Sequence, residues 1–403
     1  MLRFLRQKFT PPSQQALQVS KNFSVPLAVY ADTGERDAIL ASSGMGKSYL
    51  TGVLMEETLE NGGLICVIDP EGEHFTLSER YPMLIIGGER GQLPLSPEAF
   101  DLYFEAMLQN GFSAVFDLSE LLDVEQQAVY GQIADSLFRM SQKYRRKIRL
   151  IVEEAQIYAP QRTTGGAAPG GKNKGPDPLV ASQRIAKRGR KRAIDSLWAT
   201  QRPASISKDI LSQCNRFWFG GISAEQDYKA IKPFLTEAGI SFADIRSLKP
   251  GEFFFYSKGQ THKLRVRKRF CKHAGATPNG QLAFQATSDR SLDSALRRLA
   301  EAVAKREREH EQEEAEVARL KAYIRQLEKE KEQLKKELEQ EKLATKVIER
   351  LDGSSVGNGS RKSSRASSVN MAEALAAVNA KTPARDMPSH PDDVRWPEFT
   401  TDS

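Results

Sequence analysis

A loop of small residues at positions 41–48 carries the residue types that bind phosphate. Its backbone N–H groups can curl around a polyphosphate, its lysine can contact the β- and γ-phosphates, and the serine after the lysine can bind Mg²⁺. A helical pattern follows over residues 49–60, so the phosphates would lie at a helix N-terminus. The residues assigned to this phosphate-binding loop are Ser42, Ser43, Gly44, Met45, Gly46, Lys47 and Ser48, with Ser48 also a metal ligand.

The loop departs from the pattern G-x-x-x-x-G-K-[ST] at its first position, where Ala41 replaces glycine. A backbone with positive φ at this position would strain any residue that has a Cβ atom. Alanine is the smallest such residue, and Gly46, Lys47 and Ser48 are intact, so the sequence favours a tolerated variant. The alternative is a surface turn with the same letters.

Two adjacent carboxylates end a β-branched, apolar segment at residues 147–152. This is the layout of a Walker B strand, whose tip presents acids to a nucleotide-bound metal. Glu153 is expected to face the Mg²⁺ shell, and Glu154 to polarise the attacking water. The alternative is a strand end with two solvated carboxylates.

A further predicted strand, residues 197–200, ends in Gln201. A glutamine at such a tip can hydrogen-bond to a γ-phosphate or to its attacking water. A strongly basic segment, residues 184–192, precedes this strand and could also be an ordinary solvated cationic face.

Short apolar segments alternate with helical patterns through the first 280 residues, as a parallel sheet requires. The sequence therefore predicts an α/β fold with a doubly wound, mainly parallel sheet. Branched-chain runs such as residues 64–68 predict strands that are buried on both faces. The expected strands are Ala38–Ala41, Leu64–Asp69, Met83–Ile86, Ala114–Leu118, Ile148–Val152, Leu197–Thr200 and Arg216–Gly220.

Over residues 25–275 the chain resembles HerA-type ATPases of the HerA/FtsK superfamily, because their motifs occur here in the same order. After the phosphate-binding loop these are Asp69-Pro70-Glu71-Gly72-Glu73, Glu153-Glu154-Ala155-Gln156-Ile157-Tyr158-Ala159-Pro160, Gly189-Arg190-Lys191, Ala199-Thr200-Gln201-Arg202-Pro203 and Leu211-Ser212-Gln213-Cys214-Asn215. The resemblance implies a RecA-like fold, ATP and Mg²⁺ as cofactors, and a homo-oligomeric, hexameric ring that pumps duplex DNA. It also implies that Gln201 is the sensor and that Arg190 is an arginine finger inserted by a neighbouring subunit.

Two features distinguish the chain from the best-known HerA helicases. We do not expect the N-terminal β-barrel of these helicases here, because only about 35 residues precede the predicted strand of the phosphate-binding loop, and we expect a long helical extension at the C-terminus. The expected function is an ATP-driven DNA translocase or helicase that acts with a nuclease partner. The alternative is an ATPase that acts mainly on proteins, as a regulator or assembly factor.

Two basic segments are candidates for contact with DNA. In the first, Lys263, Arg265, Arg267 and Arg269 alternate with mostly apolar residues, so one strand face would be a cationic row. Such a row can bind phosphates without reading sequence, although charges also protect edge strands from aggregation. The second is the glycine-rich loop 163–178, for which a flexible linker is the favoured interpretation.

Beyond Ser291 apolar residues recur with 4,3 spacing among Glu, Lys and Arg, which predicts a coiled coil over residues 290–351. Its β-branched and leucine positions favour a parallel pair, and a solitary charged helix is the alternative. Residues 1–24 form a separate N-terminal segment, residues 25–280 the ATPase domain, and residues 352–403 a disordered tail with a possible docking peptide at Trp396–Thr400. The expected seam is Leu292, Leu296, Leu299, Val303, Arg306, His310, Glu313, Val317, Leu320, Ile324, Leu327, Lys331, Leu334, Leu338, Glu341, Thr345 and Ile348.

Composition narrows the class of protein. The three cysteines lack metal-ligand spacing and are too few for a disulfide framework, which predicts a reduced, cytoplasmic protein. No apolar run is long enough to span a bilayer, so no membrane association is expected. A net charge of +7 and a pI near 9.1 fit a polyanionic partner such as DNA.

Overall fold

The computed structural model describes residues 16–21, 23–26, 34–161, 176–273 and 289–353. The chain divides into two compact units, Met1–Ala318 and Arg319–Ser403. Most of the glycine-rich loop and the C-terminal tail with its docking peptide lie outside the described residues.

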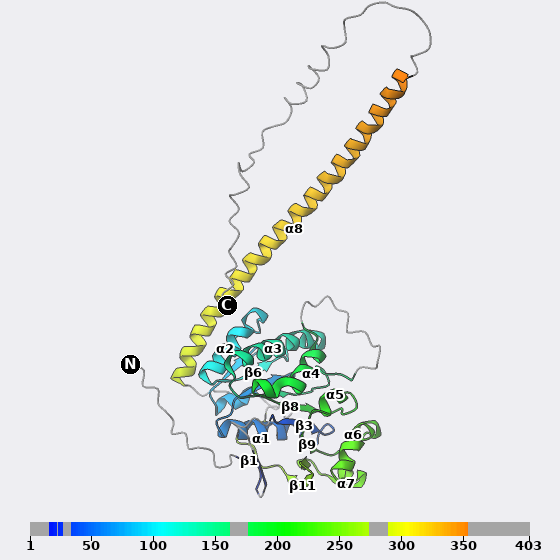
Figure 1. Cartoon of the computed structure of the whole chain (residues 1–403). Coiled ribbons are helices and arrows are strands. Elements are labelled where there is room, and N and C mark those ends of the chain that lie inside the picture. The colour runs from blue at the N-terminus through cyan, green and yellow to red at the C-terminus, as the bar shows by residue number, and fades with distance from the viewer. Residues whose placement is uncertain (1–15, 22, 27–33, 162–175, 274–288, 354–403) are drawn as a thin grey trace, which may run out of the picture. The chain divides into compact units, whose positions relative to one another are not determined.

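A mainly parallel sheet forms the centre of the first unit (Figure 1). In the described part of the chain it has nine strands, in the order β11-β10-β9-β3-β8-β7-β4-β6-β5, and only β10 and β11 run antiparallel to their neighbours. The predicted α/β fold is therefore confirmed. The strands are β3 (Arg36–Leu40), β4 (Ile65–Asp69), β5 (Met83–Ile86), β6 (Ser113–Asp117), β7 (Ile148–Val152), β8 (Ile194–Thr200), β9 (Arg216–Phe219), β10 (Glu252–Ser257) and β11 (Gln260–Arg265).

Helices cover both faces of this sheet, with α1 on one face and α2, α3 and α4 on the other (Figure 1). The helices of the first unit are α1 (Lys47–Glu60), α2 (Phe100–Asn110), α3 (Asp123–Tyr144), α4 (Pro178–Arg188), α5 (Lys208–Leu211), α6 (Glu225–Glu237) and α7 (Phe242–Ser247). Three short 3₁₀ turns, η1 (Phe75–Glu79), η2 (Pro97–Ala99) and η3 (Gly189–Arg192), complete the described helical segments of this unit.

Successive residues of the central strands enter opposite cores, since side chains alternate across a strand. In β3, Ala38 and Leu40 pack against the α2–α4 side, whereas Ile39 packs beneath α1. This explains why these strands are apolar at nearly every position, as expected for a parallel sheet covered on both faces.

The seven predicted strands coincide with β3–β9 to within a few residues at their ends. Three described segments were not predicted as separate strands: the hairpin of β1 (Ala16–Ser20) and β2 (Phe23–Pro26), and β10. The hairpin belongs to the ATPase fold, because Val19 is fully buried beneath α1 and the Gln18 amide donates to Glu57. The two strands of the hairpin are short and of mixed polarity, so they give little periodic signal, whereas the aromatic run 253–256 of β10 is a signal that could have found that strand.

The C-terminal helix α8 (Arg290–Gly353) confirms that this segment is helical. The residues of the expected coiled-coil seam, however, fall into a buried group and an exposed group. Leu292, Leu299 and Val303 are buried in the core of the first unit, and His310 pairs with Glu98 there at 3.1 Å. The first turns of the helix therefore pack on the ATPase domain instead of presenting a free seam. No helix of the described residues is both long and apolar enough to cross a membrane.

Buried charges tie the amino ends of β3, β7 and β9 together. Asp37 is fully buried and accepts two hydrogen bonds from Arg216, at 2.8 and 2.7 Å, while Arg149 lies 4.0 Å away. Burial alone would raise the pKa of Asp37, but Arg216 and Arg149 hold it below its usual value. This carboxylate is the common partner of two buried guanidinium groups.

Asp37→Ala is predicted to lower the free energy of unfolding by about 3–5 kcal/mol, because the buried Arg216 loses its bidentate partner and two buried guanidinium groups are left to share Glu35. The measurement is denaturant unfolding followed by far-UV circular dichroism. Asp209→Ala, which removes a mostly exposed partner of Lys187, should cost less than about 1 kcal/mol. Because the pKa of Asp37 is lowered on folding, its contribution is present above about pH 4 and is lost below it. Equal losses in the two variants would contradict this role.

Candidate nucleotide site

The phosphate-binding loop joins the carboxyl end of β3 to α1, as predicted. Gly44 and Gly46 have φ values of 76° and 90°, so these two positions require glycine. Helix α1 begins at Lys47 directly after Gly46, which leaves its first N–H groups open toward a phosphate. The phosphate site is therefore built on a helix N-terminus.

Ala41 does not occupy a strained position. It is absent from the residues with positive φ, and its Cβ atom lies against Gly220, where a side chain would approach it to 2.6 Å. The alanine is thus accommodated by a glycine directly after β9. The sequence shows that Ala41 replaces the first glycine of the motif. The glycine that makes room for it lies 179 positions later in the chain, so this contact can be seen only in the folded structure.

Backbone contacts from two other loops brace the phosphate-binding loop. Ser42 donates from its amide to the carbonyl of Gly221 at 2.9 Å, and the Gly251 amide donates to the carbonyl of Met45 at 3.0 Å. The Ser223 amide donates to the hydroxyl of Ser42 at 3.1 Å. These bracing residues were missed in the sequence, although the pair Gly220-Gly221 after a strand is the signal that could have indicated a close backbone approach.

Lys47 meets both predicted Walker B acids. Its Nζ atom lies 2.9 Å from Glu153 Oε2 and 2.7 Å from Glu154 Oε1, and all three side chains are at most 10% exposed. Burial alone would lower the pKa of Lys47, but the two carboxylates raise it above its ordinary value. Burial likewise opposes ionisation of Glu153, yet Lys47 and His74 hold its pKa well below the usual range. Lys47 and Glu153 are therefore both charged at neutral pH.

His74 adds a second polar contact to Glu153. Its Nε2 atom lies 3.4 Å from Glu153 Oε1, and its backbone amide donates to Asp69 at 2.8 Å. Burial would lower the pKa of His74, but Asp69 and Glu153 raise it. Burial raises the pKa of Asp69 and of Glu73. The acidic motif that follows β4 thus lies beside the Walker B strand.

The donor set fits a nucleotide-bound magnesium ion. Glu153 Oε1 is buried and lies 3.4 Å from His74 Nε2 without a well-formed hydrogen bond, so it can still bind a metal ion or one of its waters. Mg²⁺ in nucleotide sites takes one or two protein ligands and completes its shell with phosphates and waters. Ser48 and Glu153 would be those ligands. Among the described residues, no group of three or more His, Cys, Asp or Glu side chains could hold a metal by itself.

Glu154 has an unusual backbone and a second set of partners. Its φ value is 45°, in a region that few non-glycine residues adopt and that often marks a functional site. Its Oε2 atom accepts a hydrogen bond from Gln156 at 2.7 Å. Thr200, the last residue of β8, donates to the Gln156 carbonyl oxygen at 2.5 Å. Gln156 was part of the motif quoted above, but no role was predicted for it.

Gln201 and Arg190 lie at opposite ends of β8. Gln201 follows this strand at the edge that also carries the phosphate-binding loop, and it is half-buried. Arg190 precedes the strand, in η3, and its Cβ atom packs against Gly34 ahead of β3. The seven residues of β8 span about 20 Å. Arg190 is therefore far from the phosphate-binding loop of its own chain.

The expected cationic row is not a single exposed face, because β11 ends at Arg265. Lys263 and Arg265 are exposed, the latter side chain by 70%. Arg267 pairs with Glu57 at 2.6 Å, and Arg269 lies 3.4 Å from Glu56, with side chains only 11% and 2% exposed. The prediction that Arg267 and Arg269 bind DNA is corrected accordingly: they fasten the segment after β11 onto α1.

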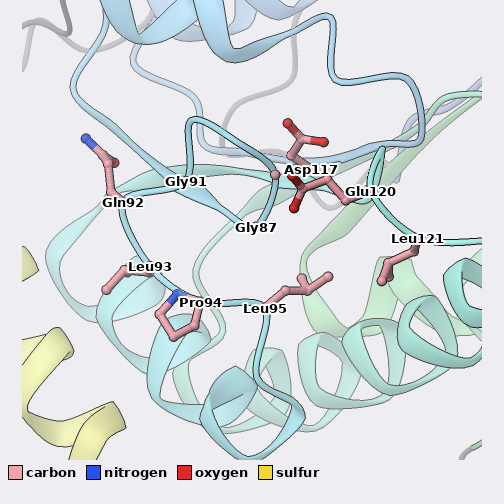
Figure 2. A pocket seen from close by; sticks show the side chains of 10 residues that line it. Gly87, Gly91, Gln92, Leu93, Pro94, Leu95, Asp117, Glu120 and Leu121 are labelled. Carbon is pink, nitrogen blue, oxygen red and sulfur yellow. The ribbon is translucent and has the colours of Figure 1, made fainter.

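A separate hollow of about 350 Å³ lies at the ends of β5 and β6 (Figure 2). Gly87 and Gly91 line it together with two carboxylates, Asp117 and Glu120. Asp117 is engaged by Ser119, whose amide and hydroxyl both donate to it. None of the residues predicted for the nucleotide site lines this hollow.

Lys47→Ala is predicted to abolish nucleotide binding, whereas Glu154→Gln should still bind ATP and lose turnover by about 10²–10⁴-fold, the usual contribution of a general base. Glu153→Asp should retain activity. Fluorescent-nucleotide titration and phosphate release measure the two effects. Glu120→Gln, in the hollow of Figure 2, is the matched control and should behave as wild type. Wild-type turnover in Glu154→Gln would remove the base assignment.

Comparison with known proteins agrees with this geometry. The family model described as "Helicase HerA, central domain" matches residues 17–93, which include the phosphate-binding loop and α1. No curated protein matches the chain at a significant level.

Several solved structures share features of the fold. VirB4 of Thermoanaerobacter pseudethanolicus is 15% identical, with a TM-score of 0.46, over 62% of this chain and 95% of its own. The genome packaging NTPase B204 from Sulfolobus turreted icosahedral virus 2, in complex with AMPPCP, is 11% identical, with a TM-score of 0.41, over 59% and 100%. The bacterial conjugative coupling protein TrwB is 11% identical, with a TM-score of 0.47, over 69% and 93%.

The family match rests on the segment that builds the phosphate site, and the Walker B acids complete that site in space. The chain therefore contains a P-loop ATPase site, and the segment that builds its phosphate-binding loop is similar to the central domain of helicase HerA.

Proposed function

We propose that this ATPase is a DNA translocase of the HerA type that acts in the cytoplasm as a homo-oligomeric, hexameric ring, in concert with a nuclease. The observation that carries the proposal is the position of Arg190, at the edge of the sheet opposite to the phosphate-binding loop. A site that needs this cation can be completed only by another copy of the chain. The family match and the basic composition support DNA as the substrate.

Within one subunit, nucleotide binding exchanges the partners of Lys47. The ammonium group leaves Glu153 and Glu154 and turns to the β- and γ-phosphates, where it neutralises charge. Glu154 Oε1 then accepts a proton from the attacking water. Ser48 and Glu153 would hold Mg²⁺, which would supply further positive charge at the phosphates when bound. Gln201, at the same edge, hydrogen-bonds to the γ-phosphate or to the water.

The arginine finger makes hydrolysis depend on assembly. Arg190 of one subunit would stabilise the charge that develops on the γ-phosphoryl group in its neighbour. A ring in which every site borrows a residue from the next subunit couples hydrolysis to subunit contacts. A translocase needs this coupling so that its subunits hydrolyse ATP in an ordered sequence.

A second function, action on protein partners through a coiled coil, is favoured by the exposed seam of the second unit. Leu320, Ile324, Leu327, Leu334 and Leu338 repeat at 4,3 spacing and are 45–64% exposed in one chain. In a parallel, in-register pair, the residues that flank this seam would bring Glu330 opposite Lys335 and Glu337 opposite Lys342 of the other copy. These complementary charges support a second copy of the chain as the occupant.

DNA stimulation of hydrolysis separates the two functions. Linear duplex DNA should raise the ATPase rate of the full chain, and the double variant Lys263→Ala/Arg265→Ala should weaken duplex binding about equally for all sequences while flattening its dependence on salt. Lys229→Ala removes another cation that is 70% exposed and should change neither property. An ATPase rate that is indifferent to duplex DNA would favour the protein-directed function.

Mixing two inactive variants tests the finger. Arg190→Ala should bind ATP and assemble but hydrolyse about 10³-fold or more slowly. Adding Lys47→Ala protein creates interfaces where an intact phosphate-binding loop meets an intact finger, so activity should partly return. Arg188→Ala, an exposed cation two residues before Arg190, should retain activity. Mixed rings without recovered activity would overturn the assignment in trans.

A further inference from the structure

Both carboxylate oxygens of Glu154 have polar partners in the structure. Oε1 lies 2.7 Å from Lys47 Nζ, and Oε2 accepts from the Gln156 amide at 2.7 Å. When Lys47 turns to the phosphates, Oε1 becomes free to accept a proton, whereas the contact to Oε2 does not involve the nucleotide. Of the two partners, Lys47 and Gln156, Gln156 is therefore the one that can keep the Glu154 carboxylate in place during the reaction.

The hydrogen bonds behind Gln156 run in one direction. The Arg202 amide donates to Thr200 Oγ1 at 3.0 Å, the Thr200 hydroxyl donates to Gln156 Oε1 at 2.5 Å, and the Gln156 NH₂ group donates to Glu154. A side-chain amide has a donor end and an acceptor end, and its neighbours decide which way it points. Because Thr200 offers its proton to the carbonyl oxygen, the NH₂ group must face Glu154. The reverse orientation would oppose two oxygen atoms.

The backbone fixes both ends of this chain of hydrogen bonds. Ala155 donates from its amide to the carbonyl of Ala199 at 2.8 Å, which ties the segment after β7 to the end of β8. The positive φ of Glu154 turns its side chain back toward Lys47. A residue in this region of φ persists only where its surroundings hold it in place. The hydrogen bonds of Gln156 and Ala155 hold Glu154 in this conformation.

The chain of hydrogen bonds also encloses the predicted sensor. Gln201 lies between Thr200 and Arg202, which supply the hydroxyl and the amide at its far end. Any shift of Gln201 toward a γ-phosphate moves both groups, because they are its covalent neighbours. Gln156, which is hydrogen-bonded to both Thr200 and Glu154, would transmit this movement to Glu154.

We propose that Gln156 is a positioning residue that orients the catalytic carboxylate of Glu154 and links it to the end of β8 beside Gln201. The proposal rests on Glu154 being the base that accepts the proton from water. Gln156 touches neither nucleotide nor water in this scheme and acts through Glu154 alone. Its removal should therefore slow turnover without weakening nucleotide binding.

Gln156→Met keeps the length of the side chain but removes its hydrogen bonds. We expect kcat to fall about tenfold or more, since a lost hydrogen bond to a charged group has an effect of this size, with KM for ATP and fluorescent-nucleotide affinity changed less than about twofold. Thr200→Val, which keeps the shape and removes the hydroxyl, should lower kcat in the same way. Thr200→Ser restores the hydroxyl and should restore kcat to near the wild-type value.

A double variant separates positioning from general damage. In a Glu154→Gln background, Gln156→Met should cause little further loss, because residues that act as one unit are not additive. Full additivity, a matching loss of nucleotide affinity, or wild-type kcat in Gln156→Met would each overturn the proposal. Failure of the base assignment itself is recognised separately, as unchanged turnover in Glu154→Gln alone.

Discussion

The parallel alignment of β3, β8 and β7 is the constraint on which the rest of the site depends. Parallel neighbours end at the same edge of a sheet, so the three strands deliver their terminal residues to one place. That edge receives Lys47 from the loop after β3, Thr200 and Gln201 from β8, and the two acids from β7. The same geometry excludes Arg190, because η3 leads into the opposite end of β8. The direction of these strands thus decides which of the candidate residues one chain brings to this edge.

Charge burial is the second organising feature, and it occurs at both ends of these strands. At the amino edge, Asp37 sits between arginines, and at the carboxyl edge, Lys47 sits between carboxylates. A buried ion is tolerated only when its partners balance it. The amino edge is permanently balanced by the fold. The carboxyl edge is balanced only while the nucleotide is absent, which makes this edge the part of the molecule that must rearrange.

Local signals predicted much of the fold and the centre of the site. The apolar segments became β3–β9, because each strand has a short apolar run that is visible in the sequence. Lys47, Glu153 and Glu154 were each named from a motif, and the structure brings them together, although a contact between them was not predicted. Contacts between distant segments could not be predicted in this way. Gly220 accommodates Ala41, Glu56 captures Arg269, and Thr200 orients Gln156, and each pairing depends on the path of the folded chain. The alternation after Lys263 was misleading for the same reason, since an acidic helix face was available to bury half of the row.

The contact of Lys47 with both acids has a consequence for the end of the catalytic cycle. Once the γ-phosphate has gone, the remaining phosphates and the two carboxylates compete for one ammonium group. The departing diphosphate leaves no bare charge behind, because Glu153 and Glu154 take its place at once. The protein thereby supplies its own counter-charge for Lys47, which lowers the electrostatic cost of releasing the product.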